Sequence, residues 1–162
     1  MKVVIQSEAA VCGLASLAIV ASYHRLRFGL AELRHRFPLS LKGAKLNHLI
    51  HIAQGIGFST RPLWLEIEDV GRLALPCILH WDFNHFVVLV KVGSSKVTIL
   101  DPAIGERKLW LKELSDHFTG VALELTPAAE FKPQQAGPAG TARHVMGPVR
   151  GPGRALAQVL LL

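Results

Sequence analysis

Residues 77–101 of this chain read CILHWDFNHFVVLVKVGSSKVTILD, and they decide the fold class. The segments 86–92 and 96–100 are rich in the apolar residues of strands, and residues 93–95 between them read Gly-Ser-Ser, a composition typical of a hairpin turn. A short apolar run at 77–80 precedes them. We therefore expect three strands here, two of them joined as an antiparallel hairpin.

The segments on either side of this stretch complete an α+β pattern. Helices are predicted at 12–23, 30–36 and 45–54, further strands at 61–66, 106–111 and 121–125, and a short helix at 111–117. Because helices come first and antiparallel strands follow, we expect one α+β domain over residues 1–127. Its N-terminal helices should pack on one face of an antiparallel sheet.

The composition is that of a globular chain. Of its 162 residues, 50% are hydrophobic and 19% are charged, so the chain can bury a core and is too apolar to be disordered. Two cysteines, Cys12 and Cys77, cannot build a secreted disulfide framework, which favours a reducing, cytosolic setting. Residues 1–10 lack the apolar core of a secretion signal. The net charge of +6 is compatible with nucleic acid or an anionic membrane surface but specifies neither.

The chain changes character at Pro127. Residues 128–154 are rich in proline, glycine and arginine, which predicts a linker without regular secondary structure. Residues 155–162, ALAQVLLL, are mostly apolar, and the chain stops inside this run. Two interpretations stay open for the run: the start of a truncated transmembrane helix, or a short helix docked on the core.

Three side chains far apart in the sequence, Cys12, His85 and Asp101, have the chemistry of a nucleophile, its base and the group that orients the base. Cys12 opens a predicted helix, whose N-terminus would stabilise a thiolate. His85 starts one strand of the hairpin and Asp101 ends the other, so strand pairing would bring them side by side. Gln6 precedes the cysteine by six residues and could donate a hydrogen bond to an oxyanion.

Each of these residues also has a purely structural interpretation. A cysteine before a helix is more often a small buried hydrophobe, which is how we interpret Cys77 in its apolar strand. A histidine at the edge of a core face is usually a hydrogen-bonded structural residue, and an Asp-Pro pair is usually a turn. His80 and Asp82 compete with His85 as candidates, but both precede a predicted turn.

The histidines and tryptophans do not form a metal or nucleic-acid motif. His48 and His51 lie three residues apart on a predicted helix, but no third ligand lies at a matching spacing, so we expect no metal site. Trp64, Trp81 and Trp110 lack the interleaved basic residues of a nucleic-acid platform, so we expect no nucleic-acid partner.

Five motifs occur together in this chain: QSEAAVCGLA at 6–15, PCILHW at 76–81, NHFVVL at 84–89, DPA at 101–103 followed by Gly105, and FTGVALE at 118–124. As a set they resemble the C39 peptidase domain at the N-terminus of bacterial peptidase-containing ABC transporters, which export bacteriocins and microcins. The colicin V exporter branch is the most similar. The resemblance covers nearly all of residues 1–127.

The resemblance implies a papain-like fold and a cysteine endopeptidase on the cytoplasmic face of the bacterial inner membrane. It implies that Cys12 is the nucleophile, His85 the general base and acid, Asp101 the orienter of His85, and Gln6 the oxyanion donor. The substrate would be a precursor peptide cut after a double-glycine-type leader, whose amphipathic helix binds an apolar groove. The partners would be the membrane and nucleotide-binding domains of an ABC transporter. ATP would be needed only there, and the peptidase domain would need no cofactor.

Two positions depart from the family's pattern without removing a catalytic group. Val11 stands where an acidic residue usually precedes the cysteine, and Tyr23-His24 replaces an aromatic-glycine pair. The alternative function is a non-catalytic docking domain of the same fold, which binds the leader without cutting it. The presence of Cys12 together with His85 and Asp101 argues against that alternative.

Overall fold

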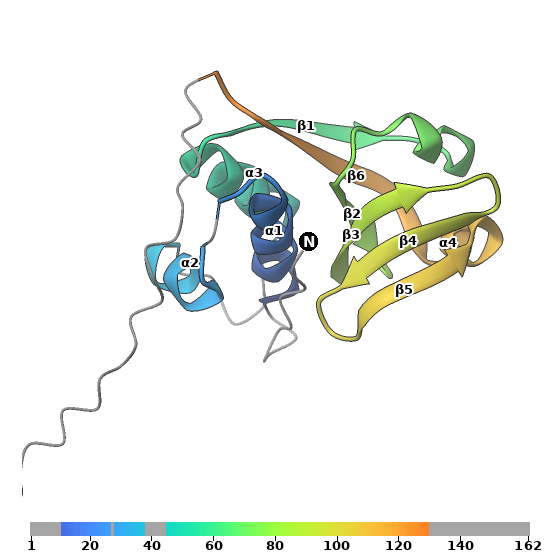
Figure 1. The fold of residues 1–162 in the computed structure, drawn as a ribbon, viewed down its shortest axis with the longest axis horizontal. Helices are drawn as coiled ribbons and strands as arrows, with labels where there is room; N and C mark the ends of the chain where they lie inside the picture. The colour runs from blue at the N-terminus through green and yellow to red at the C-terminus, as the bar shows by residue number, and fades with distance from the viewer. Residues whose placement is uncertain (1–10, 27, 38–44, 130–162) are drawn as a thin grey trace, which may run out of the picture.

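A computed structural model describes residues 11–26, 28–37 and 45–129 of the chain (Figure 1). Gln6, the apolar run 155–162 and all of the predicted linker 128–154 after residue 129 lie outside the described residues. The elements in chain order are α1 (Cys12–Tyr23), α2 (Leu30–Arg36), α3 (Leu46–Gly55), β1 (Phe58–Trp64), the 3₁₀ helix η2 (Ile67–Arg72), β2 (Cys77–Trp81), β3 (His85–Val92), β4 (Lys96–Asp101), β5 (Gly105–Trp110), α4 (Leu111–His117) and β6 (Phe118–Pro127).

Most of the predicted elements are confirmed within one residue, including the hairpin of β3 and β4. Three differences have local causes. The strand predicted at 61–66 begins three residues earlier, and it includes Pro62, which an edge strand tolerates. The 3₁₀ helix η2 was not predicted. The last strand is longer than the predicted 121–125, because a bulge around Gly120, whose φ is +86°, interrupts its alternation.

The strands form one antiparallel sheet in the order β1-β6-β2-β3-β4-β5. Strands β2 to β5 follow one another as in the sequence, so the turns before β3 and after β4 lie at the same end of the sheet. The last strand, β6, does not extend the row. It inserts between β1 and β2 and pairs with both.

Helices cover both faces of this sheet. The first three helices gather on one side (Figure 1), where α1 and α3 contact the sheet and Phe86 and Val88 of β3 point into the shared core. The alternate residues Val87 and Leu89 pack on the opposite face, in a second core that includes Leu114 of α4. The expectation for the N-terminal helices is confirmed, but α4 lies on the other face. Strand β3 is therefore buried on both sides, which explains its continuous apolar sequence.

Helix α1 is the centre of the first core. Every residue from Cys12 to Ala21 is buried, so this helix is apolar around its whole circumference rather than along one stripe. It contacts β2, β3 and the two neighbouring helices. Such burial leaves α1 little freedom to shift relative to β3.

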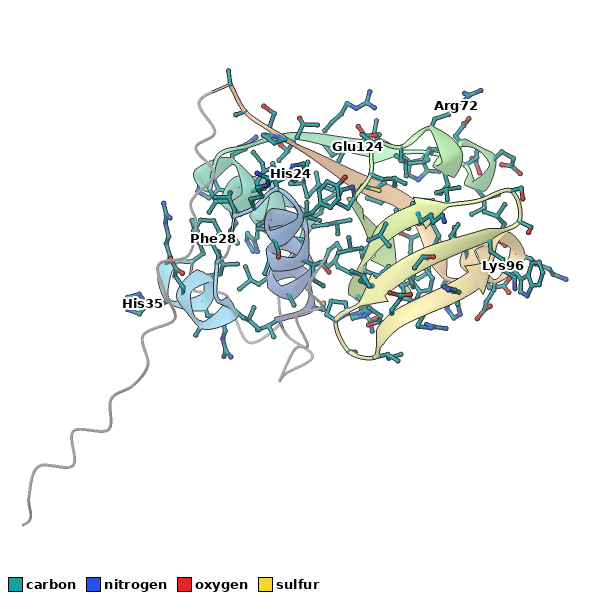
Figure 2. All side chains as sticks on the ribbon, in the orientation of Figure 1. His24, Phe28, His35, Arg72, Lys96 and Glu124 are labelled. Carbon is teal, nitrogen blue, oxygen red and sulfur yellow. The ribbon has the colours of Figure 1, made fainter. Side chains whose placement is uncertain are left out.

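The carboxylate of Glu124 links β6 to β1 and to the segment before β2. Glu124 of β6 is buried and accepts hydrogen bonds from Arg61 of β1 at 2.7 Å and from the backbone N–H of Ala74 at 2.7 Å (Figure 2). The hydrogen bond from Arg61 lowers the pKa of Glu124 most; burial opposes this effect and the Ala74 N–H adds to it, so that the pKa lies below its usual 4.5. The charged form is thus the one that the fold stabilises.

Replacing Glu124 with alanine should lower the free energy of unfolding by about 1–3 kcal/mol at neutral pH, because two donors lose their acceptor. The native pKa is lowered, so this contribution is present above pH 4.5 and is lost as the pH falls through the native value. Urea unfolding of both proteins at falling pH should show the difference shrinking. The exposed Glu66 supplies the control: Glu66→Ala should change stability by less than about 0.5 kcal/mol. A constant difference between Glu124→Ala and the parent at all pH values would contradict the assignment.

Candidate active site

The thiol of Cys12 lies at the first residue of α1, as predicted. Val11 before it makes no side-chain capping hydrogen bond to the helix. The residue is 4% exposed, and the thiol is free. A helix N-terminus stabilises negative charge, which is the property that a reactive thiolate needs.

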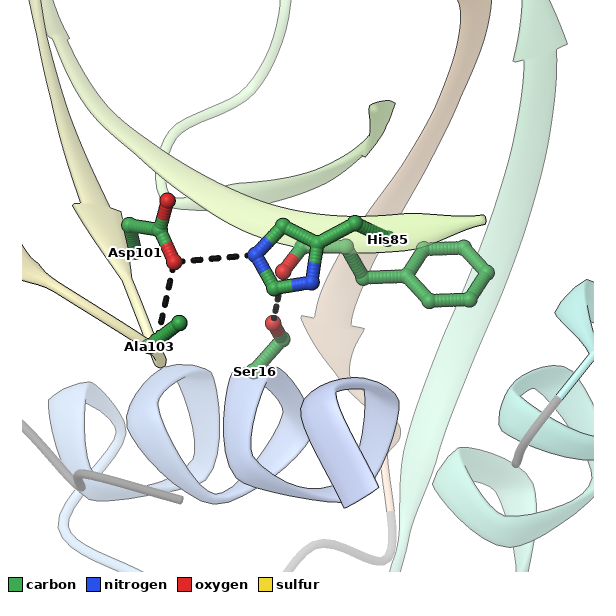
Figure 3. Close-up of polar contacts among 5 residues, drawn as sticks. Ser16, His85, Asp101 and Ala103 are labelled. Atoms are coloured by element: carbon green, nitrogen blue, oxygen red, sulfur yellow. Dashed lines mark hydrogen bonds and ion pairs between the residues drawn. The ribbon is translucent and has the colours of Figure 1, made fainter. Parts of the chain in front are cut away.

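The His85 and Asp101 side chains meet as the hairpin predicts. Val88 pairs with Leu100, so the next step of the register sets Val87 opposite Asp101 and makes His85 a diagonal neighbour on the same face. His85 Nε2 lies 2.9 Å from Asp101 Oδ1 (Figure 3). The same oxygen accepts a hydrogen bond from the backbone N–H of Ala103 at 2.8 Å. The Asp-Pro turn and the pairing with His85 therefore occur together, because the turn orients the carboxylate.

The remaining ring nitrogen of His85 is turned towards α1 (Figure 3). Cys12 is the first residue of that helix. Burial disfavours the charged ring, but hydrogen bonds and charge interactions with Cys12 and with Asp101 outweigh burial and raise the pKa of His85 to about 9. The imidazole is thus held between a thiol and a carboxylate, and the pair favours a protonated ring.

A fourth residue, Ser16, joins the two halves of this arrangement. Its Oγ donates a hydrogen bond to the backbone carbonyl of Phe86 at 3.1 Å, in the core between α1 and β3 (Figure 3). Ser16 lies one helical turn after Cys12, and Phe86 directly follows His85. The sequence analysis missed this residue, although a buried serine on a helix that is otherwise nearly all apolar was a signal to notice.

The competing candidates have other partners. His80 Nδ1 lies 2.8 Å from Thr119 Oγ1, and Asp82 Oδ1 lies 2.9 Å from His117 Nδ1. Cys77 is fully buried, and burial, with a contribution from Glu124, raises the pKa of its thiol to about 12. The interpretation of Cys77 as a core residue is confirmed.

A pocket of about 410 Å³ opens beside the His85–Asp101 pair. Its walls come from the turn between β2 and β3, the turn between β4 and β5, and the C-terminal end of α4. The lining residues are Trp81, Asp82, Asn84, His85, Asp101, Ala103, Ile104, Arg107 and His117. The pocket therefore lies on the histidine side of the thiol.

Three further observations concern the other predictions. The side chains of His48 and His51 on α3 are exposed. Among residues 11–26, 28–37 and 45–129, no group of three or more histidine, cysteine, aspartate or glutamate side chains is arranged to hold a metal ion. Within those same residues, no helix has the length and apolarity required to cross a bilayer.

Comparison with known proteins identifies relatives along the whole chain. The chain is 42% identical over 160 residues to a probable microcin-H47 secretion/processing ATP-binding protein of Escherichia coli. It is 41% identical over 160 residues to the colicin V secretion/processing ATP-binding protein of the same species. Each alignment covers 99% of this chain but only 23% of the relative, so the chain spans about a quarter of the length of these proteins.

Solved structures give the same result for the fold. A double glycine motif protease from an AMS/PCAT transporter, in complex with the leader peptide, is 34% identical, with a TM-score of 0.75 over 78% of this chain and 91% of that chain. The peptidase domain of Streptococcus ComA is 25% identical, with a TM-score of 0.72 over 78% of this chain and 98% of that chain. These matches confirm the expected papain-like α+β fold. The peptidase C39 family matches residues 1–130, and the chain belongs to this family of cysteine peptidases.

Proposed function

We propose that this chain is the peptidase part of a peptide exporter, and that it removes a double-glycine-type leader from a bacteriocin- or microcin-like precursor. The observation that carries the proposal is the orientation of the His85 imidazole: Asp101 holds Nε2 at 2.9 Å, and the other ring nitrogen faces α1, the helix that begins at Cys12 (Figure 3). The two Escherichia coli relatives are named as secretion/processing ATP-binding proteins, which supports export as the process. The solved complex with a leader peptide supports the substrate class.

The proposed reaction uses the two nitrogens of His85 differently. Nδ1, which faces α1, already holds the proton of the Cys12 thiol, because the ring is protonated at neutral pH, and the thiolate attacks the carbonyl carbon of the second glycine. The protonated ring then gives this proton to the amine of the first cargo residue as the peptide bond breaks and a thioester forms. Water, activated by the same imidazole, hydrolyses the thioester and restores the thiol. Asp101 holds Nε2 throughout, which keeps Nδ1 directed at the sulfur.

The other roles rest on the family resemblance. Gln6 would donate a hydrogen bond to the tetrahedral oxyanion, a contribution of about 3 kcal/mol where such donors have been removed. The peptidase step uses only side chains and water, and ATP would serve the nucleotide-binding domain of the transporter. With that domain as a partner, the peptidase would work at the cytoplasmic face of the inner membrane, where precursors are synthesised.

The arrangement of the site adds a requirement beyond the three side chains. Cys12 belongs to α1 and His85 to β3, so the distance between the two side chains depends on how α1 packs against β3. The hydrogen bond from Ser16 to the Phe86 carbonyl is a directional contact between this helix and this strand. We assign Ser16 as a positioning residue, because its hydrogen bond goes to the backbone carbonyl of Phe86 and not to a reacting group.

Cys12→Ala and His85→Ala should each lower cleavage of a double-glycine precursor by at least about 10³-fold, because the nucleophile and its base act as one unit. Cleavage would be followed by mass spectrometry of the two fragments. Cys77→Ala, which removes the other thiol, is the matched control and should keep activity. Cleavage that survived Cys12→Ala would overturn the mechanism. Leader binding without turnover by the unaltered chain would instead support a docking domain.

The imidazole of His85 should titrate near pH 9 in NMR spectra, well above 6.5. The native pKa is raised, so the stabilisation that His85 contributes is present in full below pH 6.5 and is lost as the pH rises through 9. Asp101→Asn removes one partner of the charged ring and should lower the pKa of His85. Cys12→Ala removes the other partner and should lower the pKa of His85 too. A wild-type value below 6.5 would mean that burial dominates and would contradict the ion pair.

Ser16→Ala should lower kcat by about tenfold, because the packing of α1 against β3 sets the position of Cys12 relative to His85. The affinity for the leader should stay within about twofold of the wild-type value. The Phe86 carbonyl would lose its donor, and unfolding should become easier by about 1–3 kcal/mol. Ser22 lies in the same helix without a side-chain bond to the sheet in the described structure, so Ser22→Ala is the control. An equal loss of kcat in both variants, or a Ser16→Ala protein with unchanged kcat, would show that Ser16 does not position the site.

A further inference from the structure

Two exposed apolar side chains stand on the turns that flank the His85–Asp101 pair. Phe83, in the turn between β2 and β3, is 85% exposed, and Ile104, in the turn between β4 and β5, is 69% exposed. The two turns lie at the same end of the sheet, because β2 to β5 run as consecutive antiparallel neighbours. Ile104 lines the pocket beside His85, as do Asp82 and Asn84 on either side of Phe83. Large apolar residues at an open pocket favour binding of an apolar ligand.

The conformation of Phe83 sets it apart from an ordinary surface residue. The turn from Trp81 to Asn84 is closed by a backbone hydrogen bond of 3.2 Å, and both central residues, Asp82 and Phe83, have positive φ values of 47° and 60°. Glycine and asparagine favour such positions, whereas a bulky aromatic residue there is an outlier. A strained backbone with an exposed aromatic ring is typical of a functional site.

The turn is held firmly on its other side. The backbone N–H of Asp82 donates to the His117 carbonyl at 3.0 Å, and the side chains of the same two residues lie 2.9 Å apart. The His117 ring stacks on Trp81 with centroids 5.0 Å apart. These contacts anchor the turn to the end of α4. Phe83 is therefore presented on a rigid support, which lowers the entropic cost of binding.

The charged groups in the pocket already have partners. His117 pairs with Asp82, His85 with Asp101, and Arg107 with Glu113 at 3.5 Å. Pairing weakens their attraction for a charged ligand. Apart from the exposed Asn84, the lining residues outside these pairs are apolar: Trp81, Ala103 and Ile104.

The direction of the proposed reaction identifies which part of the substrate reaches this place. The imidazole of His85 must give its proton to the leaving amine, so the first cargo residue has to lie within hydrogen-bond reach of the ring. The leader lies on the opposite side of the scissile bond. Because the pocket is lined by His85 and Asp101, the cargo residues just after the cut are the part of the substrate nearest to it.

We propose that Phe83 and Ile104 form an apolar rim that binds the first residues of the cargo peptide, and that this rim makes cleavage faster when those residues are large and apolar. The proposal rests on the proposed function, since it concerns the substrate of the same site. It assigns specificity to the cargo side of the bond, on a surface separate from any leader groove.

The test compares two precursors with the same leader and the same double glycine, in which the next two residues are Leu-Leu or Ser-Ser. We expect kcat/KM to be about tenfold higher for the Leu-Leu substrate, the scale at which apolar pockets discriminate. Combined Phe83→Asn and Ile104→Ala substitutions should bring this ratio close to one without changing kcat/KM for Ser-Ser. Asparagine tolerates a positive φ, so the variant should keep its fold, which urea unfolding would verify.

Trp110→Ala is the matched control. Trp110 is another exposed aromatic residue, 55% exposed and stacked under Lys96, whose position Figure 2 labels. It pairs with Lys96 at the far end of the β4–β5 hairpin, five register steps from the turn, or about 17 Å at 3.3 Å per residue. This variant should keep the wild-type ratio.

The outcomes separate the two proposals. Equal cleavage of both substrates by the wild-type chain, or a tenfold ratio that survives the double substitution, would overturn the apolar rim and leave the peptidase assignment intact. Failure of the wild-type chain to cut either substrate would overturn the proposed function itself. A preference for Leu-Leu that disappears only in the rim variant would establish the rim.

Discussion

The packing of α1 against β3 is the constraint on which the rest of the structure depends. A helix that is buried on every side cannot slide or rotate without opening cavities in a core of nearly crystalline density. Its first residue carries the thiol, and the strand beneath it begins with the imidazole. The apolar contacts between α1 and β3 hold the two layers together, and the Ser16 hydrogen bond adds a fixed direction to them. The relative position of Cys12 and His85 is thus fixed mainly by apolar packing between α1 and β3.

The sheet contributes the second half of the geometry by a different principle. Strand β3 is buried on both faces from Phe86 to Leu89, so each of these side chains has a defined neighbour above or below the sheet. At the start of β3 the burial is incomplete, so a polar side chain can be accommodated there. His85 and Asp101 lie at this end of the sheet, where the last backbone pairing aligns them and the following turn satisfies the carboxylate. Asp82 and His117 form a second aspartate–histidine pair nearby, but this pair anchors the turn between β2 and β3.

Much of this could be predicted from the sequence because the signals are local. The helices at 30–36 and 111–117 follow from local sequence signals, and the hairpin follows from its turn and the two apolar runs. The helix at 12–23 was also predicted, although it has no single apolar stripe. The meeting of His85 with Asp101 was predictable because it needs only one hairpin register. The insertion of β6 between β1 and β2 was not, since nothing in either segment encodes its partner. Ser16 escaped notice for the same reason: its acceptor is a backbone carbonyl 70 residues away.

The insertion of β6 also has a consequence for how the domain is made. A ribosome completes β1, β2 and all three residues of the His85 site before it reaches residues 118–127, which separate and join those first two strands. Pairings between segments far apart in the sequence form late, because the chain must lose conformational entropy before the contacts that stabilise the pairing are made. A nascent chain that ends before Phe118 therefore carries the reactive side chains without the strand that joins β1 to β2.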